Sequence, residues 1–127
     1  MEELKIIEWS ENWSIDNDIF YFVIFLDKND NFVGKGIVEY KGEDKKNLYC
    51  SLYHVYVNEK YRGQGYFRQL IEKCLEDIKK KEYNIVGLYA KKELITIYEE
   101  YGFEFNGKMN SDKTEYSGYL NYNDDEE

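Results

Sequence analysis

Residues 52–75 read LYHVYVNEKYRGQGYFRQLIEKCL, a strand-like run that gives way to a helix-like run within one short stretch. The first part belongs to a run of β-branched and aromatic residues that predicts a strand over residues 48–57. The second part places apolar residues at helical spacing with charges opposite, and it predicts an amphipathic helix over residues 65–81. The apolar positions of that helix are Phe67, Leu70, Ile71, Cys74, Leu75 and Ile78.

The turn between this strand and this helix (NEKYRGQGYF, residues 58–67) has the composition of an anion-binding site. The first amides of a helix have no partner within the helix, and they carry the positive end of the helix dipole. Gly63 and Gly65 let the main chain approach a ligand closely, so the turn can hold phosphate oxygens. The chain has 15 lysines but only two arginines, and both, Arg62 and Arg68, lie in or beside this turn. The planar guanidinium pairs well with phosphate, although a helix cap with a solvated arginine on each side is the alternative.

The rest of the chain predicts a β-rich first half and an alternating second half. Before the central strand, the pattern predicts strands over residues 4–9, 19–26 and 32–40, with a turn at 27–31 and a polar loop at 41–47. The continuous apolar run of residues 19–26 is typical of a strand buried on both faces. After the central helix, the pattern predicts a strand over 84–90, a helix over 93–101 capped by Gly102, and strands over 103–109 and 114–122.

A strand, a helix and another strand in succession require a crossover connection, so strands 48–57 and 84–90 are predicted to be parallel neighbours. The order β-β-β-β-α-β-α-β-β predicts an α/β (α+β) fold, with a central mixed, mostly antiparallel sheet of about six to seven strands flanked by helices. The chain has 127 residues and no proline, and it shows no linker or repeat. We therefore expect one domain over residues 1–123 and an acidic tail over 124–127.

The central stretch resembles the acetyl-CoA motif of the GNAT superfamily of N-acetyltransferases. The family pattern, (Gln or Arg)-x-x-Gly-x-(Gly or Ala), is similar to the run from Arg62 to Phe67 here, and a Val-x-Val precedes it as in the family. The resemblance implies the GNAT fold with acetyl-CoA as cosubstrate, the strand backbone binding the pantetheine arm and thioester oxygen, and the turn amides holding the pyrophosphate. The cofactor-binding residues that it implies are Val55, Tyr56, Val57, Arg62, Gly63, Gln64, Gly65, Tyr66, Phe67 and Arg68.

A second stretch, IYEEYGFEF over residues 97–105, resembles the family signature Leu-Tyr-x-x-x-Gly-Phe. The resemblance places Tyr98 where the family has its general acid. A phenol with an ordinary pKa of about 10 can protonate the thiolate that leaves after an amine attacks the thioester. Taken alone, a helix tyrosine in a chain with 14 Tyr is also an ordinary packing residue.

Phe67 departs from the family pattern, because it replaces the small residue that usually ends the phosphate motif. Its phase with Leu70 and Ile71 favours packing in the core. If it faced the pyrophosphate instead, the turn would have to open and CoA binding would weaken. Lys91 and Leu94 replace an Asn and a small residue that commonly precede the catalytic Tyr, which can remove a hydrogen bond to the cofactor.

The general base is left open by the sequence. Some family members carry a Glu at the position of Ser51, and this chain does not. His54, the only His, lies in the central strand and titrates near neutral pH, so it is a candidate base directly or through water. Its alternation with Val55 and Val57 turns it to the other side of the sheet, and a structural or exposed His is the alternative. Further candidates are Glu39 and Tyr89.

The front of the chain is short for this family, which usually inserts two helices between the first two strands. Only residues 10–18 are available here, enough for about two helical turns. We therefore expect a shortened first helical region and an open acceptor groove, which suits a protein Lys or N-terminus better than an enclosed metabolite. A partner subunit of a homodimer supplying the missing wall is the alternative.

The composition sets broader limits. The formal charge of -9 argues against a nucleic-acid or anionic-membrane surface and is compatible with a basic acceptor or simply with solubility. Cys50 and Cys74 are expected to be reduced core residues, and one His with two separated Cys does not make a metal site. The N-terminus has no secretory pattern, and no apolar run approaches the roughly 18 residues of a spanning helix, so a cytoplasmic location is expected.

The sequence thus predicts an N-acetyltransferase that moves the acetyl group of acetyl-CoA to a primary amine of a basic protein or peptide. One alternative is a GNAT-fold protein that binds an acyl-CoA or a partner without turnover. Another is an acidic decoy for a nucleic-acid-binding surface, which would not bind CoA.

Overall fold

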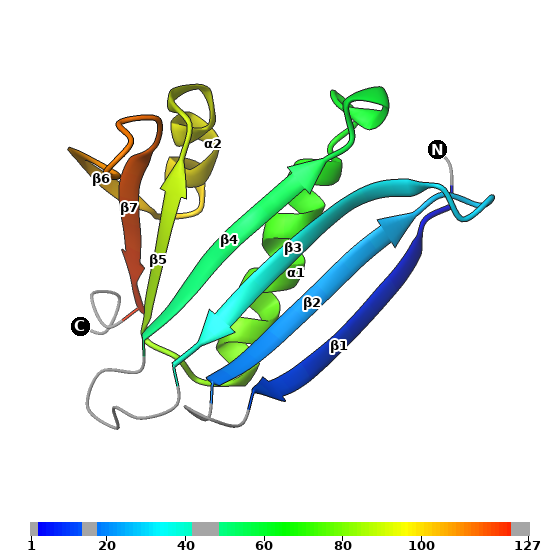
Figure 1. Ribbon diagram of the computed structural model, residues 1–127, viewed down its shortest axis with the longest axis horizontal. Helices are drawn as coiled ribbons and strands as arrows, with labels where there is room; N and C mark the ends of the chain where they lie inside the picture. Colours follow the sequence, from blue (N-terminus) through cyan, green and yellow to red (C-terminus); the bar gives the residue numbers. More distant parts are fainter. Residues whose placement is uncertain (1–2, 14–17, 42–48, 123–127) are drawn as a thin grey trace.

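The computed structural model describes residues 3–13, 18–41 and 49–122, and the strands among them form one sheet (Figure 1). The strands are β1 (Lys5–Trp13), β2 (Asp18–Leu26), β3 (Phe32–Tyr40), β4 (Tyr49–Val57), β5 (Ile85–Ala90), β6 (Glu104–Met109) and β7 (Tyr116–Asn121). The helices are α1 (Tyr66–Lys80) and α2 (Ile95–Glu100), with short 3-10 turns at Glu59–Tyr61 and Lys92–Leu94. The predicted order of elements is confirmed.

The sheet has the order β1-β2-β3-β4-β5-β7-β6. Neighbouring strands are antiparallel except β4 and β5, which are parallel. The crossover from β4 to β5 runs through α1, which lies against one face of the sheet (Figure 1). The mixed, mostly antiparallel sheet and the parallel central pair are therefore as predicted.

The core lies between α1 and the sheet, and glycines on β3 set the spacing between them. The apolar stripe of α1 is fully buried at Leu70, Ile71, Cys74 and Ile78. A Cβ on Gly36 would lie 2.8 Å from Sγ of Cys74 and 3.3 Å from Cγ1 of Val23, so only a glycine fits there. Gly34 is equally tight, against Leu70 and the backbone of β4. The glycines that interrupt this strand in the sequence therefore bring the helix close to the sheet.

Both cysteines are core residues, as predicted. Cys50 on β4 and Cys74 on α1 are free thiols with no exposed surface. Burial raises the pKa of the Cys50 thiol to about 12, and it raises the pKa of Cys74 as well. Both side chains therefore stay neutral and act as small apolar groups.

The prediction that residues 19–26 form a strand buried on both faces is wrong. Tyr21, Val23 and Phe25 are buried under α1, whereas the residues between them are only partly buried. No helix in the described part of the chain covers that second face (Figure 1). Aromatic and β-branched residues therefore occupy a half-open face that the sequence pattern assigns to the core.

The first helical region is shortened, as predicted, and in the described residues β1 pairs directly with β2. β1 continues through Trp13 and pairs with β2 from Lys5 opposite Leu26 to Trp13 opposite Asp18. Residues 14–17 lie outside the described residues, as do residues 42–48 of the predicted loop and strand start, and Asn123 with the tail 124–127. In the described ranges no helix is long and apolar enough to cross a membrane.

We predict that Gly36→Ala destabilises the fold by about 1–3 kcal/mol, because the new methyl group collides with Cys74 in a close-packed core. The loss should be smaller when the change is made in a Cys74→Ala background, where the sulfur is gone. Chemical denaturation of the wild type, both single variants and the double variant measures this coupling. Strictly additive changes in the free energy of unfolding would contradict the contact.

Candidate active site

A cleft opens where β4 and β5 separate. Their pairing joins Tyr49–Ser51 of β4 to Ile85–Gly87 of β5, and the two strands diverge beyond it (Figure 1). The cleft has a volume of about 1030 Å³ and is lined by β4, the following turn, the start of α1, β5, α2 and the start of β7. The residues of β4 from Leu52 onward pair with β3 only, so their other backbone edge faces this cleft. An extended ligand with amide groups fits such an edge.

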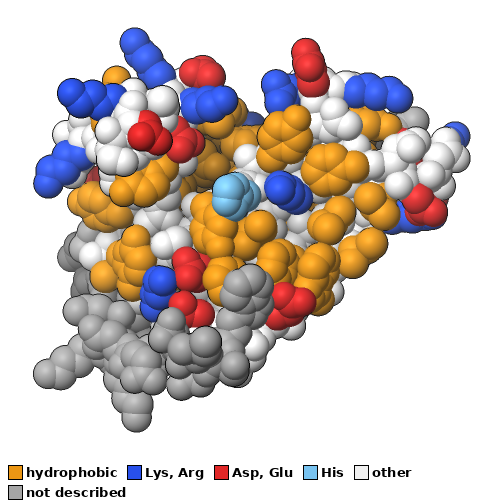
Figure 2. Space-filling model, viewed as in Figure 1, with side chains coloured by type: hydrophobic (Ala, Val, Ile, Leu, Met, Phe, Trp, Pro, Cys, Tyr) orange, Lys and Arg blue, Asp and Glu red, His pale blue; other side chains and the backbone are white. Residues whose placement is uncertain are grey.

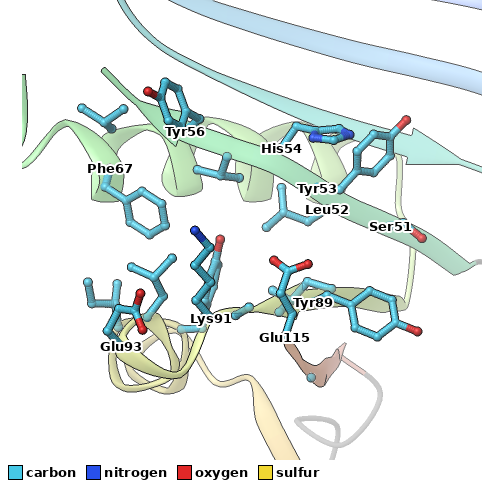
Figure 3. Close-up of a pocket in the computed structure, with 18 of the residues that line it drawn as sticks. Ser51, Leu52, Tyr53, His54, Tyr56, Phe67, Tyr89, Lys91, Glu93 and Glu115 are labelled. Carbon is cyan, nitrogen blue, oxygen red and sulfur yellow. The ribbon is translucent and has the colours of Figure 1, made fainter. Parts of the chain in front are cut away.

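A bulge in β4 shapes the upper part of the cleft. Lys35 of β3 lies opposite Tyr56, whereas Ile37 lies opposite Tyr53, so β4 carries one extra residue. His54 adopts a positive φ of 57° at this point, a conformation that a bulge residue takes up. Its ring is exposed and packs edge-on against Tyr53 at 4.6 Å between centroids. His54 and Tyr53 both line the cleft, and Figure 3 shows their rings beside each other along β4.

The turn after β4 presents helix amides to the same cleft. Gly65 caps α1 with a φ of 86°, and Gly63 has a φ of 81°, so both turn residues need the left-handed conformation that glycine allows. Among the described residues no side chain caps this helix, and its first-turn amides are available to an anion. Gly63, Gly65 and Tyr66 line the cleft, so the predicted anion-binding turn is part of it.

Arg62 holds the turn against the end of β4. Its Nε donates a hydrogen bond to the carbonyl oxygen of Val57 at 2.9 Å, and its guanidinium lies 5.4 Å from the centre of the Tyr56 ring. Arg62 is exposed and lines the cleft. Arg62 can therefore shape the turn and reach a phosphate as well.

Arg68 has a different position from the one that the sequence led us to expect. Its guanidinium forms a two-pronged pair with the carboxylate of Glu100, at 3.1 and 3.0 Å. This pair joins α1 to the end of α2, and Arg68 does not line the cleft. The geometry therefore gives Arg68 a structural role and does not support the phosphate contact predicted for it.

A buried carboxylate on the β2–β3 turn anchors the binding turn from below. Asp27 is 4% exposed, accepts hydrogen bonds from the amides of Asn29 and Asn31 at 2.8 and 2.9 Å, and accepts another from the hydroxyl of Tyr61. These bonds, that of Tyr61 first, hold the pKa of the Asp27 carboxyl well below its usual range. Because Tyr61 lines the cleft, this carboxylate fixes the turn to the sheet.

Tyr98 lies at the centre of an aromatic cluster on the α2 side. Its ring packs edge-on against Phe67 at 5.8 Å and against Phe103 at 5.6 Å. The side chain is 5% exposed and lines the cleft, and no described residue forms a hydrogen bond with its hydroxyl. Burial, with smaller effects from Cys74 and Glu115, raises the pKa of Tyr98 above its ordinary value. Phe67 packs on the core as predicted, and it also forms part of the cleft wall.

The wall of the cleft opposite β4 carries charged side chains that the sequence did not single out as a group. Figure 3 shows Lys91, at the end of β5, and Glu115, just before β7, pointing into the space between β4 and β5. Glu39 and Tyr89, the weaker candidates for the base, also line the cleft. Glu39 is bound to Lys41 at 2.9 Å, and Tyr89 is 57% exposed and points away from the centre of the cleft in Figure 3. Glu115 follows a polar turn, where acidic residues are common, so no local signal marked it.

Residues 7–114 match the family model described as acetyltransferase (GNAT) domain, which covers most of the chain. The chain belongs to the GNAT acetyltransferase family. The divergent parallel strands, the glycine turn and Tyr98 are thus placed in a fold whose family is known for acetyl transfer. In sequence, no curated protein matches the chain.

Solved GNAT structures share the fold at low sequence identity. A GNAT-family acetyltransferase from Staphylococcus aureus superposes with a TM-score of 0.64 and 17% identity, over 87% of this chain and 72% of that one. The NatC complex bound to Gag peptide and CoA gives a TM-score of 0.69 and 17% identity, over 79% and 70%. The Escherichia coli protein YhbS in complex with CoA gives 0.62 and 24% identity, over 83% and 60%. At such identities the likeness concerns the fold.

We predict that Asp27→Asn lowers the melting temperature at pH 7, because the charged acceptor for Tyr61 and two amides is lost. The folded-state pKa of Asp27 is depressed, so its contribution is complete above the ordinary carboxyl pKa of about 3.9 and fades as the pH falls below it. Thermal melts of both proteins between pH 7 and pH 3 measure this convergence. A constant gap across that range would contradict the role of the charge.

Proposed function

We propose that this protein is an N-acetyltransferase that transfers acetyl from acetyl-CoA to a primary amine on a protein or peptide. The observation that carries the proposal is the cleft itself. One side of it is an unpaired backbone edge of β4, which ends in a turn of helix amides, and a buried tyrosine lies across from that edge. These features suit three parts of one cofactor: the edge suits an amide-containing arm, the turn suits a pyrophosphate, and the tyrosine suits a thioester.

In this proposal the amides at the start of α1 hold the pyrophosphate, with Arg62 at the mouth of the cleft. The residues assigned to the turn are Gly63, Gln64, Gly65, Tyr66 and Phe67. The backbone of Val55, Tyr56 and Val57 positions the pantetheine arm and the thioester oxygen. Because the divergence from β5 leaves that edge without a strand partner, the arm can take the place of the missing strand.

Tyr98 is the proposed general acid. Attack of a neutral amine on the thioester carbonyl forms the C–N bond, and collapse of the intermediate breaks the C–S bond and releases the CoA thiolate, which takes the Tyr98 proton. The raised pKa of Tyr98 keeps its hydroxyl protonated at neutral pH, as this role requires. The binding energy of the long cofactor is used to hold the thioester next to this hydroxyl.

The open face of the sheet supports a macromolecular acceptor. Figure 2 shows hydrophobic side chains gathered over β1–β4 on the face turned away from α1, beside the cleft. On that face Trp9 stacks on Phe22 at 4.9 Å, and Phe22 lies 6.2 Å from Phe20. A small amine contacts only a small part of such a wide apolar surface, whereas a polypeptide can lie across it. The net charge of -9 favours a basic polypeptide.

The competing proposal is a GNAT protein that binds an acyl-CoA without turnover. The observation in its favour is Phe67, whose ring takes up cleft space where a small residue usually stands. Calorimetry with acetyl-CoA tests binding, and release of free CoA thiol with a panel of basic peptides tests turnover. If acetyl-CoA binds and no peptide or small amine releases thiol, the enzyme proposal is wrong. Absence of acetyl-CoA binding would eliminate both.

For catalysis, we predict that Tyr98→Phe lowers kcat about 100-fold or more and leaves the affinity for acetyl-CoA within about twofold, because only the proton donor is removed. Tyr101→Phe is the matched control, since its hydroxyl binds Glu72 at 2.7 Å outside the cleft. The raised pKa of Tyr98 further predicts no loss of wild-type activity from its ionisation below about pH 10. Equal rates for Tyr98→Phe and the control would contradict this assignment.

A further inference from the structure

Glu115 is a carboxylate of the cleft that the proposed reaction does not use. Glu115 stands directly before β7 and lines the cleft, partly buried, on the wall opposite β4. Figure 3 shows its carboxylate oxygens pointing into the space below β4. It therefore faces the space between β4 and β5 in which the proposed reaction places the thioester.

The backbone of Glu115 is held firmly by the turn that joins β6 to β7. The side-chain oxygen of Asn110 accepts hydrogen bonds from the amides of Thr114 and Glu115 at 2.9 and 3.2 Å. The amide of Asn110 in turn donates to the carbonyl oxygen of Glu115 at 3.0 Å. These bonds fix the position at the edge of the cleft from which the side chain extends.

The carboxylate itself is uncommitted. Across residues 3–13, 18–41 and 49–122, no side chain or amide forms an ion pair or hydrogen bond with it. The other candidate bases differ from it in pairing or in burial. Glu39 is bound to Lys41, and His54 is exposed on the bulge beside Tyr53. A partly buried carboxylate without a partner is ready to receive a cation.

Glu115 also acts electrostatically on the proposed acid. After burial and Cys74, its charge makes a smaller contribution to the raised pKa of Tyr98. A neutral buried phenol and a carboxylate that line the same cleft have the complementary states that an acid and a base need.

We infer that Glu115 is the acceptor-side base: it binds the acceptor ammonium and takes the proton that the nitrogen loses, directly or through one water. This inference rests on the proposed acetyl transfer. The bound ammonium first loses one proton through Glu115 to solvent, which leaves a neutral amine. The amine nitrogen then forms its bond to the acetyl carbon while its second proton passes to Glu115, and the C–S bond breaks while Tyr98 protonates the thiolate. Proton return from Glu115 to solvent and from solvent to Tyr98 restores the site. The net reaction is ammonium plus acetyl-CoA to amide, CoA and one proton.

The experiment compares the wild-type chain with Glu115→Gln, Glu115→Asp and a control, Glu104→Gln, which changes an exposed Glu on the same hairpin outside the cleft. Two acceptors are used: a peptide whose one free amine is a Lys side chain, and the same peptide with an aminooxy group in place of that ammonium. The aminooxy group is neutral at pH 7 and needs no base to become a nucleophile. Melting temperature and calorimetric affinity for acetyl-CoA are recorded for every protein.

Glu115→Gln should lower kcat/KM about 100-fold or more with the Lys peptide. With the aminooxy peptide the fold-loss should be smaller by at least a factor of about ten. Glu115→Asp should lie between it and the wild type, and Glu104→Gln should match the wild type. Affinity for acetyl-CoA should stay within about twofold throughout.

If Glu115→Gln stays within about threefold of the wild type, or loses both acceptors equally, the base assignment is wrong while the acetyl transfer stands. A loss of acetyl-CoA binding or of folding in both Glu115 variants would also overturn it, in favour of a structural role. A wild-type protein that binds acetyl-CoA and acetylates neither peptide nor any amine of the panel would overturn the proposed function and the base together.

Discussion

The short parallel contact between β4 and β5 is the constraint on which the candidate site depends. The two strands are paired over Tyr49–Ser51 and then diverge, which leaves one backbone edge of β4 without a neighbouring strand. In a buried sheet, the N–H and C=O groups of such an edge normally pair with a neighbouring strand. Here the edge faces a cleft that a ligand can enter. The bulge at His54 adds one residue to β4 without shifting its buried end, so Val57 still packs in the core. Binding capacity and stability are thus combined in one strand.

The rest of the structure keeps that divergence in place. Gly34 and Gly36 bring α1 against β3 and β4, so the start of the helix has a fixed position relative to the open edge. Tyr61 reaches from the binding turn to Asp27 on the β2–β3 turn, and Arg62 reaches back to the last carbonyl of β4. The turn is therefore tied to two parts of the sheet before any ligand arrives, and little conformational entropy is lost on binding.

The sequence predicted what local patterns determine. The stripe of apolar residues from Phe67 to Ile78 gave α1 to within a residue, and Gly102 indeed closes α2, since the amides of Gly102 and Phe103 bind back to Glu99 and Tyr98. Contacts between distant residues escaped the same reasoning. Arg68 pairs with Glu100, which lies 32 positions away in the chain, and the residues around Arg68 do not indicate that partner. The extra residue at His54 is visible only in the register with β3.

The sequence pattern wrongly predicted that β2 is buried on both faces, and it did not single out Glu115. Both features depend on elements that lie elsewhere in the chain, which a local pattern does not report. An apolar run shows that a strand can be buried, but a covering element has to exist, and β1 pairs directly with β2 instead of leading into described helices. Because no described helix covers this face, the apolar side chains beside His54, which is pale blue in Figure 2, are exposed next to the cleft. With that wall gone, acceptor selection falls to the charge inside the cleft and to the aromatic face beside it. In the proposed reaction, Glu115 on the β6–β7 hairpin supplies a negative charge inside the cleft for a cationic acceptor.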